Sequence, residues 1–252
     1  NVAGLDIYAP SAYDRSVCFV GPCVPPQAQP DAQQPADDEV IAWMDKMHAE
    51  GRRVVCINMG TIYYYQPQDY AHMVQALHMI HEQNPNVAFL WKIAQRPKHV
   101  QNIPSEDEAA LPPYVRRLSW IPSMTAVMEH PALAVMMHHG GGNSLNECLA
   151  YGIPQFCISQ WVDTHDIGLC IRHSGVGLWS EYSPDFVPED ICSQLLQLVE
   201  DKDHTFRHTA LSWKLKTQQA GGTKFAADLI QSYVTDYTYA GGSSKAPMPH
   251  AM

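Results

Sequence analysis

Short apolar runs of strand length alternate with longer stretches of helical periodicity along most of the chain. The run at 134–137 is apolar throughout, as expected for a strand that is covered on both faces. The predicted strands span 54–58, 87–93, 115–119, 134–137 and 155–159. The predicted helices span 68–83, 143–151, 167–173, 188–200, 203–219 and 223–233. This alternation predicts an α/β fold with a Rossmann-like, doubly wound parallel sheet.

The first 36 residues differ from the rest of the chain. A short strand is expected at 16–20, and the prolines between Pro25 and Pro35 are typical of an extended linker. We interpret residues 1–36 as the end of an N-terminal domain and an interdomain linker. The acidic residues at 37–39 suit the first turn of a helix that opens an α/β domain at 37–236. Residues 237–252 are expected to form a flexible, polar tail.

Composition and charge exclude several classes of function. The chain has 16 basic and 26 acidic residues, a formal charge of −10, and no basic block that would favour nucleic acid or an anionic membrane. No apolar run reaches the length of a membrane helix, and no signal-peptide pattern is present. The seven cysteines include no C-x-x-C pair, so neither a zinc site nor a disulfide framework is expected. A reducing, cytoplasmic setting is the simplest interpretation.

A glycine-rich loop, His138-His139-Gly140-Gly141-Gly142, joins the fourth predicted strand to the next helix. Glycines allow the backbone to approach a phosphate, and a helix N-terminus supplies free N–H groups. Asn143 or Ser144 can bind one phosphate oxygen, and His139 can donate a hydrogen bond to another. Alternatively, Ser144 and Glu147 form an S-x-x-E capping box that needs no ligand.

The loop also has features of two other kinds of site. His-Gly-Gly-Gly resembles the oxyanion loop of lipase-like hydrolases, but their G-x-S-x-G nucleophile motif is missing from the chain. His138 and His139 are possible metal ligands, yet neighbours on a strand point to opposite faces, so His138 is expected to be a packed histidine. The D-x-D sequence at 201–203 lies between two helices and is expected to be a solvated surface run.

Motifs on both sides of the loop resemble those of the UDP-glycosyltransferases, in their order along the chain. They are Asn58-Met59-Gly60-Thr61, Ser119-Trp120-Ile121-Pro122-Ser123, His130-Pro131, Gly152-Ile153-Pro154, Trp161-Val162-Asp163-Thr164 and Gly175-Val176-Gly177. The resemblance covers about 19–233 and is greatest to fungal members. It implies that residues 37–236 are the UDP-sugar-binding, C-terminal half of a two-domain GT-B enzyme.

The resemblance also implies a role for individual residues. Trp120 would stack on the uracil ring, the Ile121 backbone would pair with the base edge, and Glu147 would bind the ribose hydroxyls. Asp163 and Thr164 occupy the positions that contact the donor sugar. The residues implied for the diphosphate are Thr61, His139, Gly141, Gly142, Asn143 and Ser144.

Some of these positions have simpler explanations or depart from the family pattern. Trp120 can be an ordinary core aromatic, and Asp163 a loop or helix-cap residue. Ser123 and Thr164 stand where the family has glutamines, and Gly142 stands where plant members have tryptophan. Because Thr164 cannot make the bidentate sugar contact of glutamine, the departures bear on the donor sugar more than on the nucleotide.

The activity implied is inverting, metal-independent transfer of a hexose, expected to be glucose, from UDP to a hydroxyl of a lipophilic small molecule. No cofactor is expected beyond the UDP-sugar itself. The family's catalytic histidine and acceptor pocket lie in the N-terminal domain, so this chain is expected to bind UDP-sugar without transferring it. The alternatives are a stand-alone half that needs a partner subunit, as in split N-acetylglucosaminyltransferases, and a non-enzymatic binding module.

Overall fold

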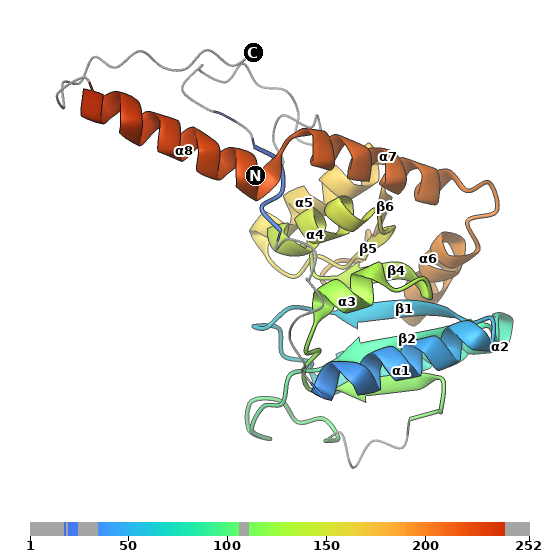
Figure 1. Cartoon of the computed structure of the whole chain (residues 1–252). Helices are drawn as coiled ribbons and strands as arrows, with labels where there is room; N and C mark the ends of the chain where they lie inside the picture. Colours follow the sequence, from blue (N-terminus) through green and yellow to red (C-terminus); the bar gives the residue numbers. More distant parts are fainter. Residues whose placement is uncertain (1–17, 19, 25–34, 106–110, 240–252) are drawn as a thin grey trace.

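The computed structural model describes residues 18, 20–24, 35–105 and 111–239. These residues form a six-stranded sheet of order β3-β2-β1-β4-β5-β6 in which every pair is parallel (Figure 1). The strands are β1 (Arg53–Asn58), β2 (Val87–Lys92), β3 (Val115–Leu118), β4 (Leu133–His138), β5 (Gln155–Cys157) and β6 (Gly177–Trp179). The predicted doubly wound parallel sheet is confirmed.

Helices follow the strands in the predicted alternation. They are α1 (Pro35–Ala49), α2 (Pro67–Gln83), α3 (Met124–Glu129), α4 (Gly142–Tyr151), α5 (Val162–Ser174), α6 (Pro188–Glu200), α7 (Thr205–Gln219) and α8 (Gly222–Tyr239). The main differences from the prediction are that α5 begins at Val162 instead of Ile167, that α8 ends at Tyr239 instead of 233, and that α3 and β6 were not predicted. With six and three residues, α3 and β6 are too short to show a periodic pattern.

Alternate residues of the central strands pack into two different cores. Val55 and Phe89 belong to a cluster that also contains buried residues of α2 and α6. Val54 and Ala88 point the other way, into a cluster with buried residues of α1 and α3. Since successive strand residues face opposite sides, helices on both sides leave these strands without a solvated face.

The predicted strand at 16–20 is not formed by its described residues, Cys18 and Val20. Instead, the Val20 carbonyl accepts a hydrogen bond of 2.7 Å from the Gly222 N–H, so this segment lies against the start of α8. The predicted linker falls mostly on 25–34, outside the described residues. Helix α8 continues through the expected boundary at 236 and extends away from the sheet (Figure 1). Within the described ranges, no helix is both long and apolar enough to cross a membrane.

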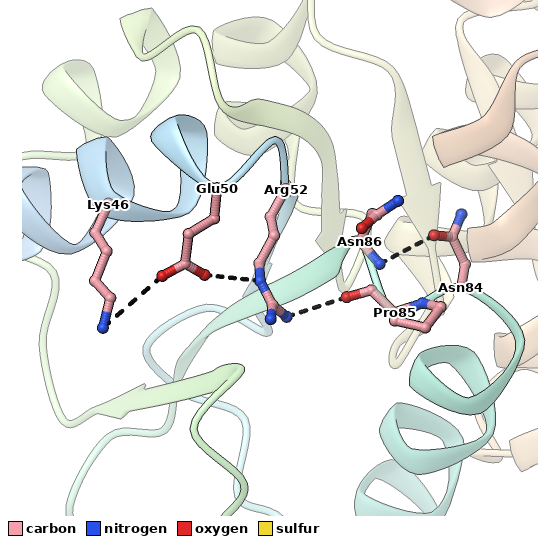
Figure 2. A network of polar contacts seen from close by, with 6 residues as sticks. All are labelled: Lys46, Glu50, Arg52, Asn84, Pro85 and Asn86. Atoms are coloured by element: carbon pink, nitrogen blue, oxygen red, sulfur yellow. Dashed lines mark hydrogen bonds and ion pairs between the residues drawn. The ribbon is translucent and has the colours of Figure 1, made fainter.

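A polar network ties the turns that precede β1 and β2 (Figure 2). The Arg52 guanidinium donates to the Pro85 carbonyl at 3.0 Å and pairs with Glu50 at 3.0 Å. The Asn86 N–H donates to the Asn84 side chain at 3.2 Å. Exposed ion pairs of this kind add little stability, so the network mainly fixes the turns at the amino-terminal edge of the sheet.

The D-x-D sequence at 201–203 has a structural role that the sequence analysis missed. Asp201 is buried, and its carboxylate accepts hydrogen bonds from the Phe206 and Arg207 N–H groups at 3.1 and 2.9 Å. The prediction of a wholly solvated run was therefore wrong, because Asp201 satisfies the free N–H groups at the start of α7.

Candidate functional site

The strand order reverses at β1, so the carboxyl ends of β1 and β4 meet at the switch point of the sheet. Asn58 pairs in register with His138 on one side and with Lys92 of β2 on the other. Loops that follow such strand ends commonly hold ligands in doubly wound folds. Here the loop containing Gly60 and the glycine-rich loop lie beside each other.

The His139 imidazole fills the space between these two loops. A Cβ added to Gly60 would lie 2.7 Å from His139 Cε1, and one added to Gly141 would lie 2.6 Å from Nε2. Trp161 packs edge-on against the ring at 5.4 Å between centroids. Burial lowers the pKa of His139 below its usual value, against a smaller opposing effect of Asp163. His139 is therefore neutral near pH 7 and can act as a hydrogen-bond donor without a full charge.

His138 supports the loop from inside the core, as predicted for a packed histidine. Its Nδ1 accepts a hydrogen bond from the Gly140 N–H at 3.0 Å, so Nε2 carries the proton donated to Gln155 Oε1 at 2.9 Å. Gly140 has φ of +88°, which glycine adopts without strain. No group of three or more potential metal ligands occurs among the described side chains.

The helix after the loop begins earlier than the capping-box interpretation requires. Gly141 is the N-cap of α4 and has no side-chain cap, and the Leu145 N–H donates to its carbonyl at 3.1 Å. Ser144 is thus the third helical residue, and the alternative interpretation of Ser144 and Glu147 as a capping box is wrong. The N–H groups of Gly142, Asn143 and Ser144 precede the helical ladder and form the end that attracts anions.

Glu147 lies one turn further along α4, on the face shared with Asn143 and Ser144. Its carboxylate is half-buried, and burial raises its pKa above the usual range. No salt bridge to Glu147 is formed by the described residues, so its oxygens remain free to accept hydrogen bonds from a ligand.

Trp120 follows β3 and is 60% exposed, so the interpretation of an ordinary core aromatic was wrong. A flat apolar ring at the carboxyl edge of the sheet is suited to stacking. The Ile121 side chain is buried in the core below it. Ser123 caps α3, its hydroxyl accepting a hydrogen bond from the Ala126 N–H at 3.2 Å.

Asp163 and Thr164 open α5 but face different surroundings. Asp163 is exposed, on the first turn of the helix. Thr164 is only 1% exposed, and its hydroxyl accepts from the Gln160 and Trp161 N–H groups and donates to the Trp161 carbonyl at 2.6 Å. This geometry argues against the predicted sugar contact by Thr164, since the hydroxyl is fully used in shaping its own loop.

Two cations that the sequence analysis missed border the Gly60 loop. The Lys92 ammonium donates to the Gly60 carbonyl at 3.3 Å, and the Arg96 guanidinium donates to the Thr61 carbonyl at 2.5 Å. The sequence held one signal of this arrangement, namely a lysine within an otherwise apolar strand run at 87–93.

Residues 98–225 match the family described as "Erythromycin biosynthesis protein CIII-like, C-terminal domain". The match spans about half of the chain. The chain belongs to this family. It is a C-terminal domain of the GT-B UDP-glycosyltransferases, and the resemblance inferred from the sequence motifs is confirmed.

Among relatives of this EryCIII-like domain is erythritol-mannosyl-transferase 1 of the fungus Mycosarcoma maydis, 26% identical over 264 residues. The limonoid UDP-glucosyltransferase of Citrus unshiu is also 26% identical, over 244 residues. These matches cover 81% and 89% of this chain but only 43% and 46% of the two relatives. The chain thus spans somewhat less than half the length of these relatives.

The fold is also that of solved glycosyltransferases. UDP-glucose: anthocyanidin 3-O-glucosyltransferase in complex with UDP superposes with a TM-score of 0.64 at 20% identity, over 82% of this chain and 44% of that one. At this identity the likeness establishes the fold alone.

The packing around His139 makes a prediction for the two neighbouring glycines. Gly141→Ala places a methyl group 2.6 Å from Nε2 and should lower the free energy of unfolding by about 1–3 kcal/mol. Gly142→Ala meets none of the described atoms outside its own helix turn within 4 Å and should leave stability unchanged or raise it by up to ~1 kcal/mol. Urea denaturation of the two variants checks this, and equal stabilities would contradict the described packing.

The buried His138 predicts a dependence of stability on pH. Its pKa in the folded chain is lowered by burial to about 4, whereas an unfolded histidine titrates near 6.5. Between these values only the unfolded chain takes up the proton, so stability falls by about 3 kcal/mol as the pH drops from 6.5 to 4. His138→Asn should flatten this part of the curve of unfolding free energy against pH. The exposed His173→Asn should leave it as in the parent chain.

Proposed function

We propose that this chain is the donor-binding domain of an inverting, UDP-sugar-dependent glycosyltransferase that transfers a hexose to a hydroxyl of a small molecule. The proposal depends chiefly on one observation. The N-terminus of α4, the imidazole of His139 and the exposed ring of Trp120 all lie at the carboxyl edge of the sheet in a chain of this family.

The nucleoside would bind between Trp120 and α4. The exposed indole offers a stacking surface for uracil, and the neighbouring Ile121 backbone would contact the base edge. Glu147 offers a pair of carboxylate oxygens to the two ribose hydroxyls. Its partly buried setting strengthens such hydrogen bonds relative to those in water.

The diphosphate would lie over the start of α4. The N–H groups of Gly142, Asn143 and Ser144, with the side chains of the latter two, surround the end of the helix. The neutral His139 donates an N–H, and the exposed Thr61 hydroxyl reaches the other side from the Gly60 loop.

In the proposed reaction the oxygen of an acceptor hydroxyl attacks the anomeric carbon from the face opposite UDP. The new C–O bond forms as the bond to the diphosphate oxygen breaks, and UDP leaves with the electron pair, which inverts the anomeric centre. The α4 N-terminus and His139 stabilise the negative charge that develops on UDP. Asp163, exposed at the start of α5, would accept hydrogen bonds from sugar hydroxyls.

We propose further that the acceptor, a lipophilic molecule, and the base that takes its proton are held by residues beyond this chain. This is supported by the 43–46% of each relative that the chain matches. Those residues belong either to another part of the same polypeptide or to a partner subunit.

We also propose a cytoplasmic setting, which is supported by the observation that all seven cysteines are free. A fluorescent fusion that entered the secretory pathway would contradict that setting.

The donor sugar is proposed to be glucose, as named for the Citrus unshiu relative. A second candidate is mannose, because a relative that matches over most of the chain is named for mannosyl transfer to erythritol. Calorimetric titration with UDP-glucose and UDP-mannose separates these two candidates, and titration with UDP-N-acetylglucosamine tests the donor of the split enzymes.

The nucleoside contacts predict that two substitutions weaken UDP binding. Trp120→Ala removes the stacking surface, and Glu147→Ala removes the ribose acceptor. Each should raise the Kd for UDP about tenfold, equivalent to ~1.4 kcal/mol, in isothermal titration calorimetry. Tyr182→Ala, which removes another exposed aromatic ring, should leave the Kd unchanged. If Glu147→Ala binds UDP as tightly as the parent chain, the proposed ribose contact is wrong.

Because the acceptor and the catalytic base are proposed to be held by residues outside it, the 252-residue chain should bind UDP-sugar but not transfer the sugar. Product formation with phenolic and sterol acceptors, measured by mass spectrometry, should stay at background.

The Kd for UDP should be the same with and without EDTA, since the proposed contacts include no metal ion. Robust glycosylation by the isolated chain, or loss of UDP binding in EDTA, would contradict the proposal.

A further inference from the structure

Lys92 is a buried cation that pairs with no carboxylate of the described residues. It ends β2, and only 6% of the residue is exposed. Its ammonium donates to Asn58 Oδ1 and to the Gly60 carbonyl, both at 3.3 Å. None of the described acidic side chains forms a salt bridge with it. A buried charge that is held only by neutral oxygens is costly, so its presence needs a reason.

A second cation lies close by. Arg96 donates to the Thr61 carbonyl and packs its guanidinium 5.1 Å from the centre of the Tyr64 ring. Its Nε is buried and has no hydrogen-bond partner among the described residues. Burial and the nearby Arg96 charge both lower the pKa of Lys92, so the two cations repel each other across the Gly60 loop. An anion bound between them would relieve this repulsion.

Lys92 lies between the proposed binding sites for the uracil ring and for the diphosphate. Its ammonium lies 4.8 Å from the centre of the Trp120 ring, and it contacts the loop whose glycine packs against His139. An ammonium has three N–H donors, and the described residues use two of them. The third is left for a ligand at this edge of the sheet.

The rest of the site supplies little positive charge. His139 is neutral near pH 7 because burial lowers its pKa, and the chain as a whole carries a formal charge of −10. The α4 N-terminus contributes only about half an elementary charge. A nucleoside diphosphate brings two or more negative charges, which these groups alone do not balance.

We infer that Lys92, assisted by Arg96, is the principal cation for the diphosphate of the donor and contributes through its charge. This inference rests on the proposed function, because it assigns a new residue to the same site. The competing explanation is structural: Lys92 only holds the Gly60 loop and the Trp120 ring in place.

Two substitutions separate charge from geometry. Lys92→Met removes the ammonium and retains a flexible apolar side chain of similar length. Asn58→Asp keeps an oxygen in position to accept from both Lys92 and the Gly60 N–H, now at 3.3 and 3.1 Å, but places a carboxylate beside the ammonium. Lys202→Met is the matched control, because it removes one positive charge from a side chain that is 83% exposed, between α6 and α7.

The experiment is calorimetric titration of each variant with uridine and with UDP. If Lys92 acts through its charge, Lys92→Met and Asn58→Asp should each raise the Kd for UDP about tenfold while the Kd for uridine changes less than threefold. Lys202→Met should match the parent chain for both ligands. Thermal unfolding shows whether each variant is folded.

Two results overturn the inference. One is an equal loss of uridine and UDP affinity in Lys92→Met, which would show that the lysine only positions Trp120. The other is parental UDP affinity in Asn58→Asp, which decides the question even if Lys92→Met does not fold. Failure of the parent chain to bind UDP at all is a separate outcome that overturns the proposed function and this inference together.

Discussion

At the junction of β1 and β4, one imidazole ring fills the space that side chains at two glycine positions would otherwise occupy. His139 packs against Gly60 from one loop and Gly141 from the other, at distances that leave no room for a Cβ on either. This contact sets the separation of the two loops and, through Gly141, the point at which α4 begins. The positions of the free N–H groups and of Glu147 one turn later follow from that start.

The second constraint is electrostatic. Burial lowers the pKa of both histidines of the glycine-rich loop, so both are neutral near pH 7. His138 fixes the turn from below through Gly140 and Gln155. Positive charge lies instead beside the Gly60 loop, in Lys92 at the end of β2 and in Arg96. An acidic protein thereby keeps a local region suited to an anion.

Much of the fold could be predicted from the sequence because its strands are buried on both faces. Continuous apolar runs such as 134–137 and helices with clear periodicity such as α6 leave strong local patterns. The elements that were missed, α3 and β6, are short and are stabilised by their neighbours more than by their own pattern. The role of Asp201 could not be predicted from the sequence either, because only the three-dimensional structure shows its carboxylate capping α7.

For the site, the sequence by itself determined the family, the order of the motifs and the positions of the glycines in the two loops. These are local features, and motif spacing preserves them. The tertiary structure decided which side chains are available: Trp120 is exposed, the Thr164 hydroxyl is used within its own loop, and Ser144 does not cap its helix. It also brought Lys92 and Arg96 to the Gly60 loop. Burial and hydrogen-bond partners depend on segments distant in the sequence, and no local pattern records them.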